Sequence, residues 1–230
     1  EMDELSEYVK ILDKCGVDAV IVSDVGVMSL VQKNSKLSIH VSTQSSCLNV
    51  SSAKLWKNLG AKRIVLGREV SLKEASRIKK EVGIEIEVFI HGSMCMSYSG
   101  NCTISNYTAG RDSNRGGCIQ SCRFSYSIVP AQSDKIFYKP KQNSESLLSS
   151  KDLRGMRLLP KYFENGIDCI KVEGRMKSAL YAATTTIAYS QALNWCRLAS
   201  REKCSEKLIE LSAVLEKIPH RGYTEASLEK

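Results

Sequence analysis

The chain has 230 residues, of which 43% are hydrophobic and 25% are charged, and a chain of this size buries about 70% or more of its unfolded surface. Thirty-three lysines and arginines against 25 aspartates and glutamates give a formal charge of +8, which favours an anionic partner such as nucleic acid or a small polyacid. The sequence has no apolar run of about 18 residues, which a membrane span requires, and no signal-peptide pattern at its start. We therefore expect a soluble, cytoplasmic protein without a membrane partner.

Residues 1–91 repeat one unit, in which an apolar β-branched run is followed by a turn and a segment with helical apolar spacing. The expected helices cover residues 3–14, 25–34, 49–58 and 71–81. The strands start at residues 17, 39, 63 and 85, which are 22 to 24 residues apart. That spacing accommodates a crossover helix, so neighbouring strands should be parallel. The expected strands are Val17–Val22, Ile39–Val41, Arg63–Leu66 and Glu85–Ile90.

The repeat of strand, turn and helix stops over residues 92–150, which form a Cys-rich insertion. We expect a small hairpin at 126–129 and 135–138 and a polar loop at 141–151. The repeat returns over 151–230 as a helix at 156–165, a strand at Ile167–Glu173 and helices at 177–199 and 201–217. Five parallel strands with intervening helices predict an α/β fold, either a partial TIM-like (β/α) barrel or a doubly wound sheet. Because such barrels have eight strands and about 250 residues, we favour a partial barrel that lacks its first strands.

Four of the nine cysteines fall within the 28 residues 95–122, and they are Cys95, Cys102, Cys118 and Cys122. In a reducing cytosol, clustered cysteines are more often metal ligands or catalytic groups than disulfides. Four thiolates on a flexible loop suit a structural zinc or an iron–sulfur cluster, and the wide, irregular spacing favours the cluster. The alternative is that these are four ordinary buried or free thiols with no shared role. Four cysteines in so polar a segment fit core packing poorly.

Basic and polar side chains accompany these cysteines and the predicted strand ends. Arg111, Arg115 and Arg123 are candidates for nucleic-acid phosphates, although Arg111 and Asp112 could equally pair on a loop surface. Because the carboxyl ends of parallel strands share one face, residues after different strands should meet there. The candidates are His40, Ser42, Thr43, Gln44, Arg68, Glu69, His91, Glu173, Arg175 and Lys177. With Lys171, the basic members among them would suit a dicarboxylate or a phosphate. Each residue alone could be a helix cap, a surface charge or a core histidine.

The signatures HExxH, GxSxG, GxxxxGK[ST] and GxGxxG are absent. The sequence therefore lacks the usual motif evidence for a zinc protease, an α/β-hydrolase, a P-loop enzyme or a simple dinucleotide-binding fold. A serine or cysteine protease would need a histidine base, for which only His40, His91 and His220 are available.

The stretch from Glu87 to Ser105 (EVFIHGSMCMSYSGNCTIS) resembles the signature of peptidase family U32, the collagenase-like proteases. Further resemblance lies in the stretches 40–44, 68–69, 110–123, 150–153, 171–177 and 220–223. The resemblance covers nearly the whole chain, which would begin after the first two barrel strands of the family and end before its small C-terminal domain.

The resemblance implies a barrel-like fold and an iron–sulfur cluster, of the 4Fe-4S type, on the cysteine segment. For many relatives it also implies oxygen-independent hydroxylation of a tRNA wobble uridine or a ribosomal cytidine, with prephenate as a small dicarboxylate co-substrate. Others act in ubiquinone hydroxylation or are named collagenases. One departure matters, because several relatives carry another cysteine just after Ser-Lys-Asp-Leu, where this chain has Arg154.

Carried over by motif, the cluster ligands would be Cys95, Cys102, Cys118 and Cys122. We predict that His91, Glu173 and Arg175 are catalytic and that Arg68, His40, Gln44, Lys171 and Lys177 bind the substrate. The leading hypothesis is an RNA-modifying protein that acts on tRNA or rRNA. A peptidase and an electron-transfer or assembly partner in ubiquinone hydroxylation are the alternatives, and a homo- or hetero-oligomer is left open.

Overall fold

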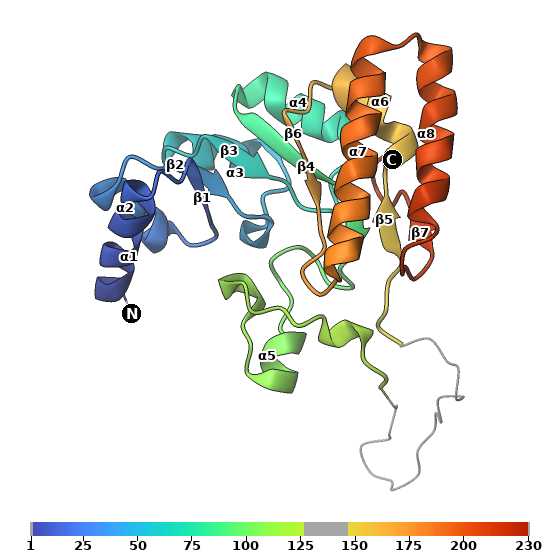
Figure 1. The fold of residues 1–230 in the computed structure, drawn as a ribbon. Helices are drawn as coiled ribbons and strands as arrows, with labels where there is room; N and C mark the ends of the chain where they lie inside the picture. Colours follow the sequence, from blue (N-terminus) through green and yellow to red (C-terminus); the bar gives the residue numbers. More distant parts are fainter. Residues whose placement is uncertain (1, 127–146, 230) are drawn as a thin grey trace, which may run out of the picture.

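The computed structural model describes residues 2–126 and 147–229. They form one mixed β-sheet with helices packed against it (Figure 1). The strands run in the order β1-β2-β3-β4-β5-β7, and β6 pairs with β4 outside this path. Their bounds are β1 Ala19–Val22, β2 Ser38–Val41, β3 Arg63–Val65, β4 Glu85–Ser93, β5 Asp152–Arg154, β6 Cys169–Val172 and β7 Tyr223–Thr224.

The helices are α1 Met2–Lys14, α2 Val25–Asn34, α3 Val50–Asn58, α4 Leu72–Val82, α5 Ile104–Ala109, α6 Leu159–Glu164, α7 Ala179–Leu198 and α8 Arg201–Leu215. Side-chain caps begin several of them: Asp24, Asn49, Ser71 and Ser178 each accept a hydrogen bond from a backbone N–H of the first turn. Within residues 2–126 and 147–229, no helix is long and apolar enough to cross a membrane.

The five predicted strands exist and are parallel: β1, β2, β3, β4 and β6 pair in one direction. The structure does not confirm the predicted TIM-like barrel, because the sheet is not closed. Among the described strands, β1 pairs only with β2, and β7 pairs only with β5. The fold is therefore mixed α/β with a mostly parallel, open sheet.

Strand β5 was not predicted, and it runs antiparallel to the end of β4, with Asp152 opposite Ser93 and Arg154 opposite His91. Because His91 is also opposite Val172 of β6, β5 and β6 lie on opposite edges of β4. The last turns of the chain add β7 beside β5. The predicted hairpin at 126–129 and 135–138 falls almost wholly outside the described residues.

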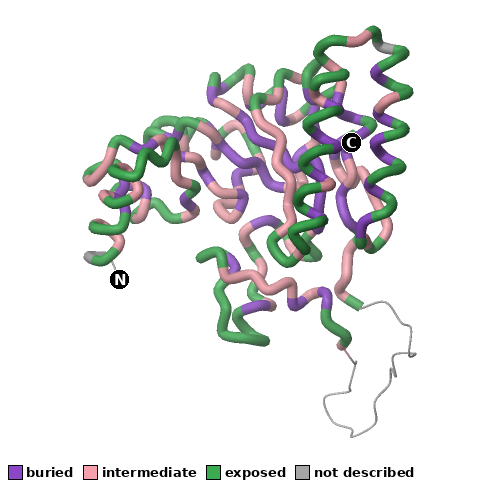
Figure 2. Tube along the Cα trace, viewed as in Figure 1, coloured by how far each residue is buried: buried purple, intermediate pink, exposed green. Residues whose placement is uncertain are grey.

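Alternation along the strands separates an apolar face from a charged one. Ile64, Ile86 and Ile90 are at most 1% exposed, and the buried path along β4 is visible as the purple stretch in Figure 2. The charged face carries ion pairs across strands, with Arg63 Nη2 2.8 Å from Glu85 Oε2 and Lys171 Nζ 2.8 Å from Glu87 Oε1. The helices therefore rest on an aliphatic core, and the opposite sheet face combines these ion pairs with the buried side chains of Val65 and Phe89.

Candidate functional site

The Cys-rich segment, defined as residues 92–126, crosses the carboxyl ends of the parallel strands, where Figure 1 shows it in green with α5. After β1, the hydroxyl of Ser23 donates to the carbonyl of Asn114 at 3.0 Å. After β3, the Glu69 carboxylate accepts from the backbone N–H of Ser99 at 2.8 Å. Ser46, after β2, bonds the Ser99 carbonyl. The strand ends and the cysteines thus occupy one region of the molecule.

Glu173 and Arg175, which follow β6, hold the same segment in place. The Glu173 carboxylate accepts from the Ser93 N–H at 2.9 Å and from the Gln120 side-chain amide at 3.3 Å. Arg175 Nη1 donates to the Gly116 carbonyl at 2.6 Å. Both residues were predicted to be catalytic, and in this structure they bind the segment that carries the cysteines.

The approach of this loop to β4 requires a glycine at position 92. Gly92 has φ +110°, and a Cβ there would lie 2.2 Å from the Glu173 carbonyl oxygen. A side chain at this position would therefore be strained and would push the β6–α7 loop away from the segment.

We expect Glu173→Gln to loosen the segment, because the amide retains one acceptor oxygen where the carboxylate has two. Hydrogen bonds to a charged acceptor contribute about 1.5–3 kcal/mol each, so amides of residues 116–123 should exchange with solvent about tenfold faster. Hydrogen exchange followed by mass spectrometry measures the change. The exposed Glu164→Gln on α6 is the matched control, and equal exchange in both variants would contradict the clamp.

A buried charge cluster centres on Asp152, which is 1% exposed. Its Oδ1 lies 3.3 Å from Arg123 Nη2 and its Oδ2 lies 3.2 Å from Lys177 Nζ. Arg123 also donates to the carbonyls of Ser150 and Met94, at 2.8 and 3.2 Å. Arg123, predicted to contact nucleic acid, has a side chain only 7% exposed. It therefore ties the residues beside Cys122 and Cys95 to strand β5.

His91 is enclosed by the rings of Tyr181, Tyr189 and Tyr223, whose centroids lie 5.5 to 5.9 Å from its own. The His91 ring is 1% exposed; Nδ1 lies 3.3 Å from the Tyr189 hydroxyl, and Nε2 has no hydrogen-bond partner among the described residues. Burial lowers the pKa of His91 to about 4, with Asp152 acting in the opposite sense. The imidazole, predicted to be catalytic, is thus neutral and shielded from solvent.

The predicted substrate-binding residues lie at different depths. The Arg68 guanidinium stacks 3.9 Å above the Phe89 ring and makes no ion pair within the described ranges. Lys171 is engaged with Glu87 on the charged sheet face, where His40 also lies. Burial lowers the pKa of His40, and Arg63 adds to that effect. The side-chain oxygen of Gln44 is buried without a hydrogen-bond partner among the described residues.

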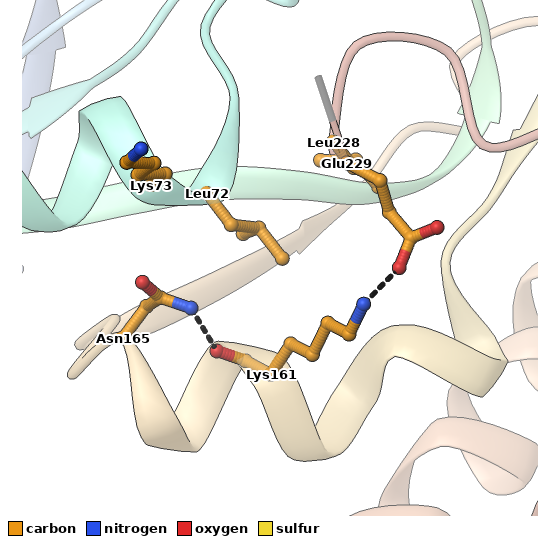
Figure 3. Close-up of a pocket in the computed structure, with 6 residues that line it drawn as sticks. All are labelled: Leu72, Lys73, Lys161, Asn165, Leu228 and Glu229. Carbon is orange, nitrogen blue, oxygen red and sulfur yellow. Dashed lines mark hydrogen bonds and ion pairs between the residues drawn. The ribbon is translucent and has the colours of Figure 1, made fainter.

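Two hollows on the described residues differ in size and in place. A hollow of about 10 Å³, lined by Arg68, Phe89 and Met94 among others, has room for roughly one water molecule. A cavity of about 280 Å³ lies elsewhere, between α4, α6 and the chain end. Figure 3 shows Lys161 paired with Glu229 across it, and none of the predicted site residues lines it.

All four clustered cysteines are free thiols, and Cys95 is exposed while Cys102, Cys118 and Cys122 are half-buried. The pKa of Cys122 is raised, first by burial and further by the other three thiols, while Arg123 opposes the shift. The Cys118 sulfur accepts from the Gln120 N–H at 3.4 Å. The four sulfurs therefore share one electrostatic neighbourhood.

As a donor set, four soft thiols from one segment fit an iron–sulfur cluster or zinc. The structure does not gather these thiols into a closed metal site. Within residues 2–126 and 147–229, no three His, Cys, Asp or Glu side chains form a group that could hold a metal ion. Arg154 offers no thiol: it pairs with Glu216, and its guanidinium lies 4.3 Å above the Tyr223 ring.

Sequence reasoning assigned no role to Asp152 or to the tyrosines around His91. Asp152 lies in the stretch 150–153 and Tyr223 in the stretch 220–223, both of which carried the family resemblance. Their position inside these motifs was the available signal. Tyr181 and Tyr189 lie eight residues apart on α7, close to two helical turns of about 3.6 residues each. That spacing was the only sign in the sequence that the two tyrosines share a face of the helix.

The protein is a mixed α/β protein with an open, mostly parallel sheet, and a cysteine-bearing segment lies over the carboxyl edge of that sheet (Figure 1). The model of peptidase family U32 matches residues 1–230, and the chain belongs to this family. It is 40% identical over 195 residues to "tRNA hydroxylation protein P1" of Bacillus subtilis (strain 168), covering 84% of this chain and 46% of that protein.

Two further relatives carry different names. "23S rRNA 5-hydroxycytidine C2501 synthase" of Escherichia coli (strain K12) is 35% identical over 194 residues, covering 84% of this chain and 29% of that protein. "Collagenase" of Porphyromonas gingivalis (strain ATCC BAA-308 / W83) is 27% identical over 191 residues, covering 78% of this chain and 45% of that protein. The chain thus spans about half the length, or less, of these relatives.

Proposed function

We propose that this protein is a cytoplasmic, RNA-modifying member of the family that supports oxygen-independent hydroxylation of tRNA, at the wobble uridine, or of rRNA. The observation that carries the proposal is the position of the segment that bears the four thiols: it lies over the carboxyl edge of the sheet, where Glu173 and Arg175 clamp it, and the thiols influence one another electrostatically there. The names of the Bacillus subtilis and Escherichia coli relatives support the RNA assignment.

Cys95, Cys102, Cys118 and Cys122 would hold the iron–sulfur cluster, which supplies one-electron redox chemistry when bound. Arg68 stacks on Phe89 without a carboxylate partner within the described ranges, and its guanidinium would bind a carboxylate of a small dicarboxylate such as prephenate. Arg111 and Arg115 are exposed on the segment, where they would meet RNA phosphates.

Metal analysis tests the first step. After anaerobic reconstitution with iron and sulfide, we expect about four irons and four sulfides per chain, the content of a 4Fe-4S cluster. Cys118→Ser should lose them, and Cys15→Ser, which changes an exposed cysteine outside the group, should retain them. Zinc bound in preference to iron, or equal iron in both variants, would refute the cluster.

Nucleoside mass spectrometry of RNA tests the second step. A strain that lacks the gene should lose hydroxyuridine from tRNA or hydroxycytidine from rRNA, and the Cys15→Ser allele should restore the modification while Cys118→Ser does not. Unchanged modified nucleosides in the deletion strain would remove the RNA assignment and leave the metal result standing.

The family description and the Porphyromonas gingivalis relative favour a peptidase as the second candidate. Within the described residues, however, no Ser, Thr or Cys side chain is hydrogen-bonded to a histidine, the arrangement that activates a nucleophile. Peptide cleavage that persists in Cys118→Ser would support the peptidase. A third candidate, an electron-transfer partner, predicts a bound cluster without turnover by the isolated protein.

A further inference from the structure

The helical hairpin formed by α7 and α8 contains a second, separate pair of cysteines. Cys196 lies in the last turn of α7 and Cys204 in the first turns of α8, with only Ala199 and Ser200 between the helices. Figure 1 shows the two helices side by side at the far right of the molecule. The Cys196 and Cys204 sulfur atoms are 3.0 Å apart.

We propose that Cys196 and Cys204 are a reversible dithiol–disulfide site that reacts with small-molecule disulfides of the glutathione class. The two sulfur atoms already point at each other from adjacent helices, and a disulfide bond of about 2 Å needs a closure of roughly 1 Å. No such neighbour exists for Cys15 or Cys47 among the described sulfurs.

The two cysteines differ in access, which assigns their order of reaction. Cys204 is 5% exposed and Cys196 is half-buried. The Cys196 thiol first loses its proton to solvent. The resulting thiolate attacks one sulfur of the small disulfide, forms a mixed disulfide and releases the other half as a thiolate. Cys204 then gives its proton to the first released thiolate; the Cys204 thiolate attacks the Cys196 sulfur of the mixed disulfide, forms the Cys196–Cys204 bond and releases the second small thiolate, which takes a proton from solvent. Two protein thiols are oxidised, and one small disulfide is reduced to two thiols.

The surroundings make this reaction slow. Burial raises the pKa of Cys196 to about 12, and the adjacent Cys204 thiol adds to the effect, so little thiolate is present at neutral pH. Once a mixed disulfide has formed, the neighbouring sulfur is within contact distance and resolves it. The site therefore responds to sustained oxidising conditions and resists brief exposure.

The pair lies far from the candidate functional site. Ser178 begins α7 beside the carboxyl edge, and the 18 residues from there to Cys196 span about 27 Å of helix. The midpoint of α7 supplies Tyr189, whose hydroxyl contacts His91. A crosslink at the far end would hold α7 against α8 and so stiffen one wall of the histidine enclosure without touching the four clustered thiols.

Peptide mapping tests the proposal on the full 230-residue chain. Trypsin cleaves after Lys177, Arg197 and Lys203, which places Cys196 in the peptide 178–197 and Cys204 in the peptide 204–207. After incubation with glutathione disulfide and blocking of free thiols, we expect these two peptides to be joined. Dithiothreitol should separate them, and the oxidised chain should show a higher melting temperature that dithiothreitol reverses.

Variants identify the role of each sulfur. Cys204→Ser should trap Cys196 as a mixed disulfide with glutathione, Cys196→Ser should leave Cys204 unmodified, and Cys15→Ser should crosslink as the unmutated chain does. Recovery of Cys196 and Cys204 as two free thiols, or as two separate glutathione adducts, would overturn the proposal. So would crosslinking of either residue to Cys15, Cys47 or Cys169 in preference to its partner.

Discussion

Asp152→Ala should lower the free energy of unfolding by about 3–5 kcal/mol, the usual cost of removing one partner from a buried ion pair. The substitution removes the carboxylate that lies 3.3 Å from Arg123 and 3.2 Å from Lys177, two cations whose side chains are only 7% and 16% exposed. Urea unfolding followed by circular dichroism measures the loss. Arg123 also carries the contacts to Met94 and Ser150, so the Cys-rich segment should separate from β5 as well.

Glu210→Ala is the matched control for this experiment. Glu210 pairs with Lys207 at 2.6 Å, but its side chain is 65% exposed, and such surface pairs contribute about 0–1 kcal/mol. A loss in Asp152→Ala no larger than that of Glu210→Ala would show that the buried cluster does not hold β5 and the segment together.

Acidification from about pH 6.5 to about pH 4 should cost the protein about 3 kcal/mol of stability through His91 alone. Burial lowers the pKa of His91 to about 4 from an ordinary value of 6.5. Between these values the unfolded chain binds a proton that the folded chain does not, so protons favour unfolding. The contribution of His91 is present in full above about pH 6.5 and is lost as the pH falls toward 4.

His91→Phe isolates this contribution, because phenylalanine keeps a ring among the three tyrosines and cannot be protonated. Denaturant unfolding of both proteins at a series of pH values gives two curves. We expect the difference between them to be constant above pH 7 and to change by about 3 kcal/mol in favour of the variant as the pH falls to 4. Parallel curves would show that His91 is solvated in the native protein.

The repeating part of the fold was predictable, because each element there carries its own local signals. The predicted helix at 25–34 coincides with α2, whose start is set by the Asp24 cap. The strands β2, β3 and β4 begin within one residue of the predicted positions, since apolar β-branched runs bounded by turns mark them. By contrast, β5 has three residues, Asp-Leu-Arg, and forms because β4 and β7 pair with it. Pairing between distant segments leaves no mark in a short polar stretch.

The shared location of the strand ends was also predictable, since parallel strands place their carboxyl ends on one edge. The partners of these residues were not. Arg123 has the appearance of a surface arginine in the sequence, yet it is buried against Asp152, 29 residues away. His91 is enclosed by tyrosines 90 to 132 residues downstream, namely Tyr181, Tyr189 and Tyr223. Such enclosure depends on tertiary packing, to which a single residue type gives no clue.

The contacts of Arg154 constrain how position 154 can change over evolution. An isolated exchange of this arginine for cysteine would leave Glu216 with His220, 3.2 Å away, and would uncover one face of the Tyr223 ring, while His220 stays stacked on that ring. Lineages that gain or lose a thiol at this place should therefore alter position 216 or 223 in the same interval. Ancestral reconstruction across the family can look for that linked substitution history.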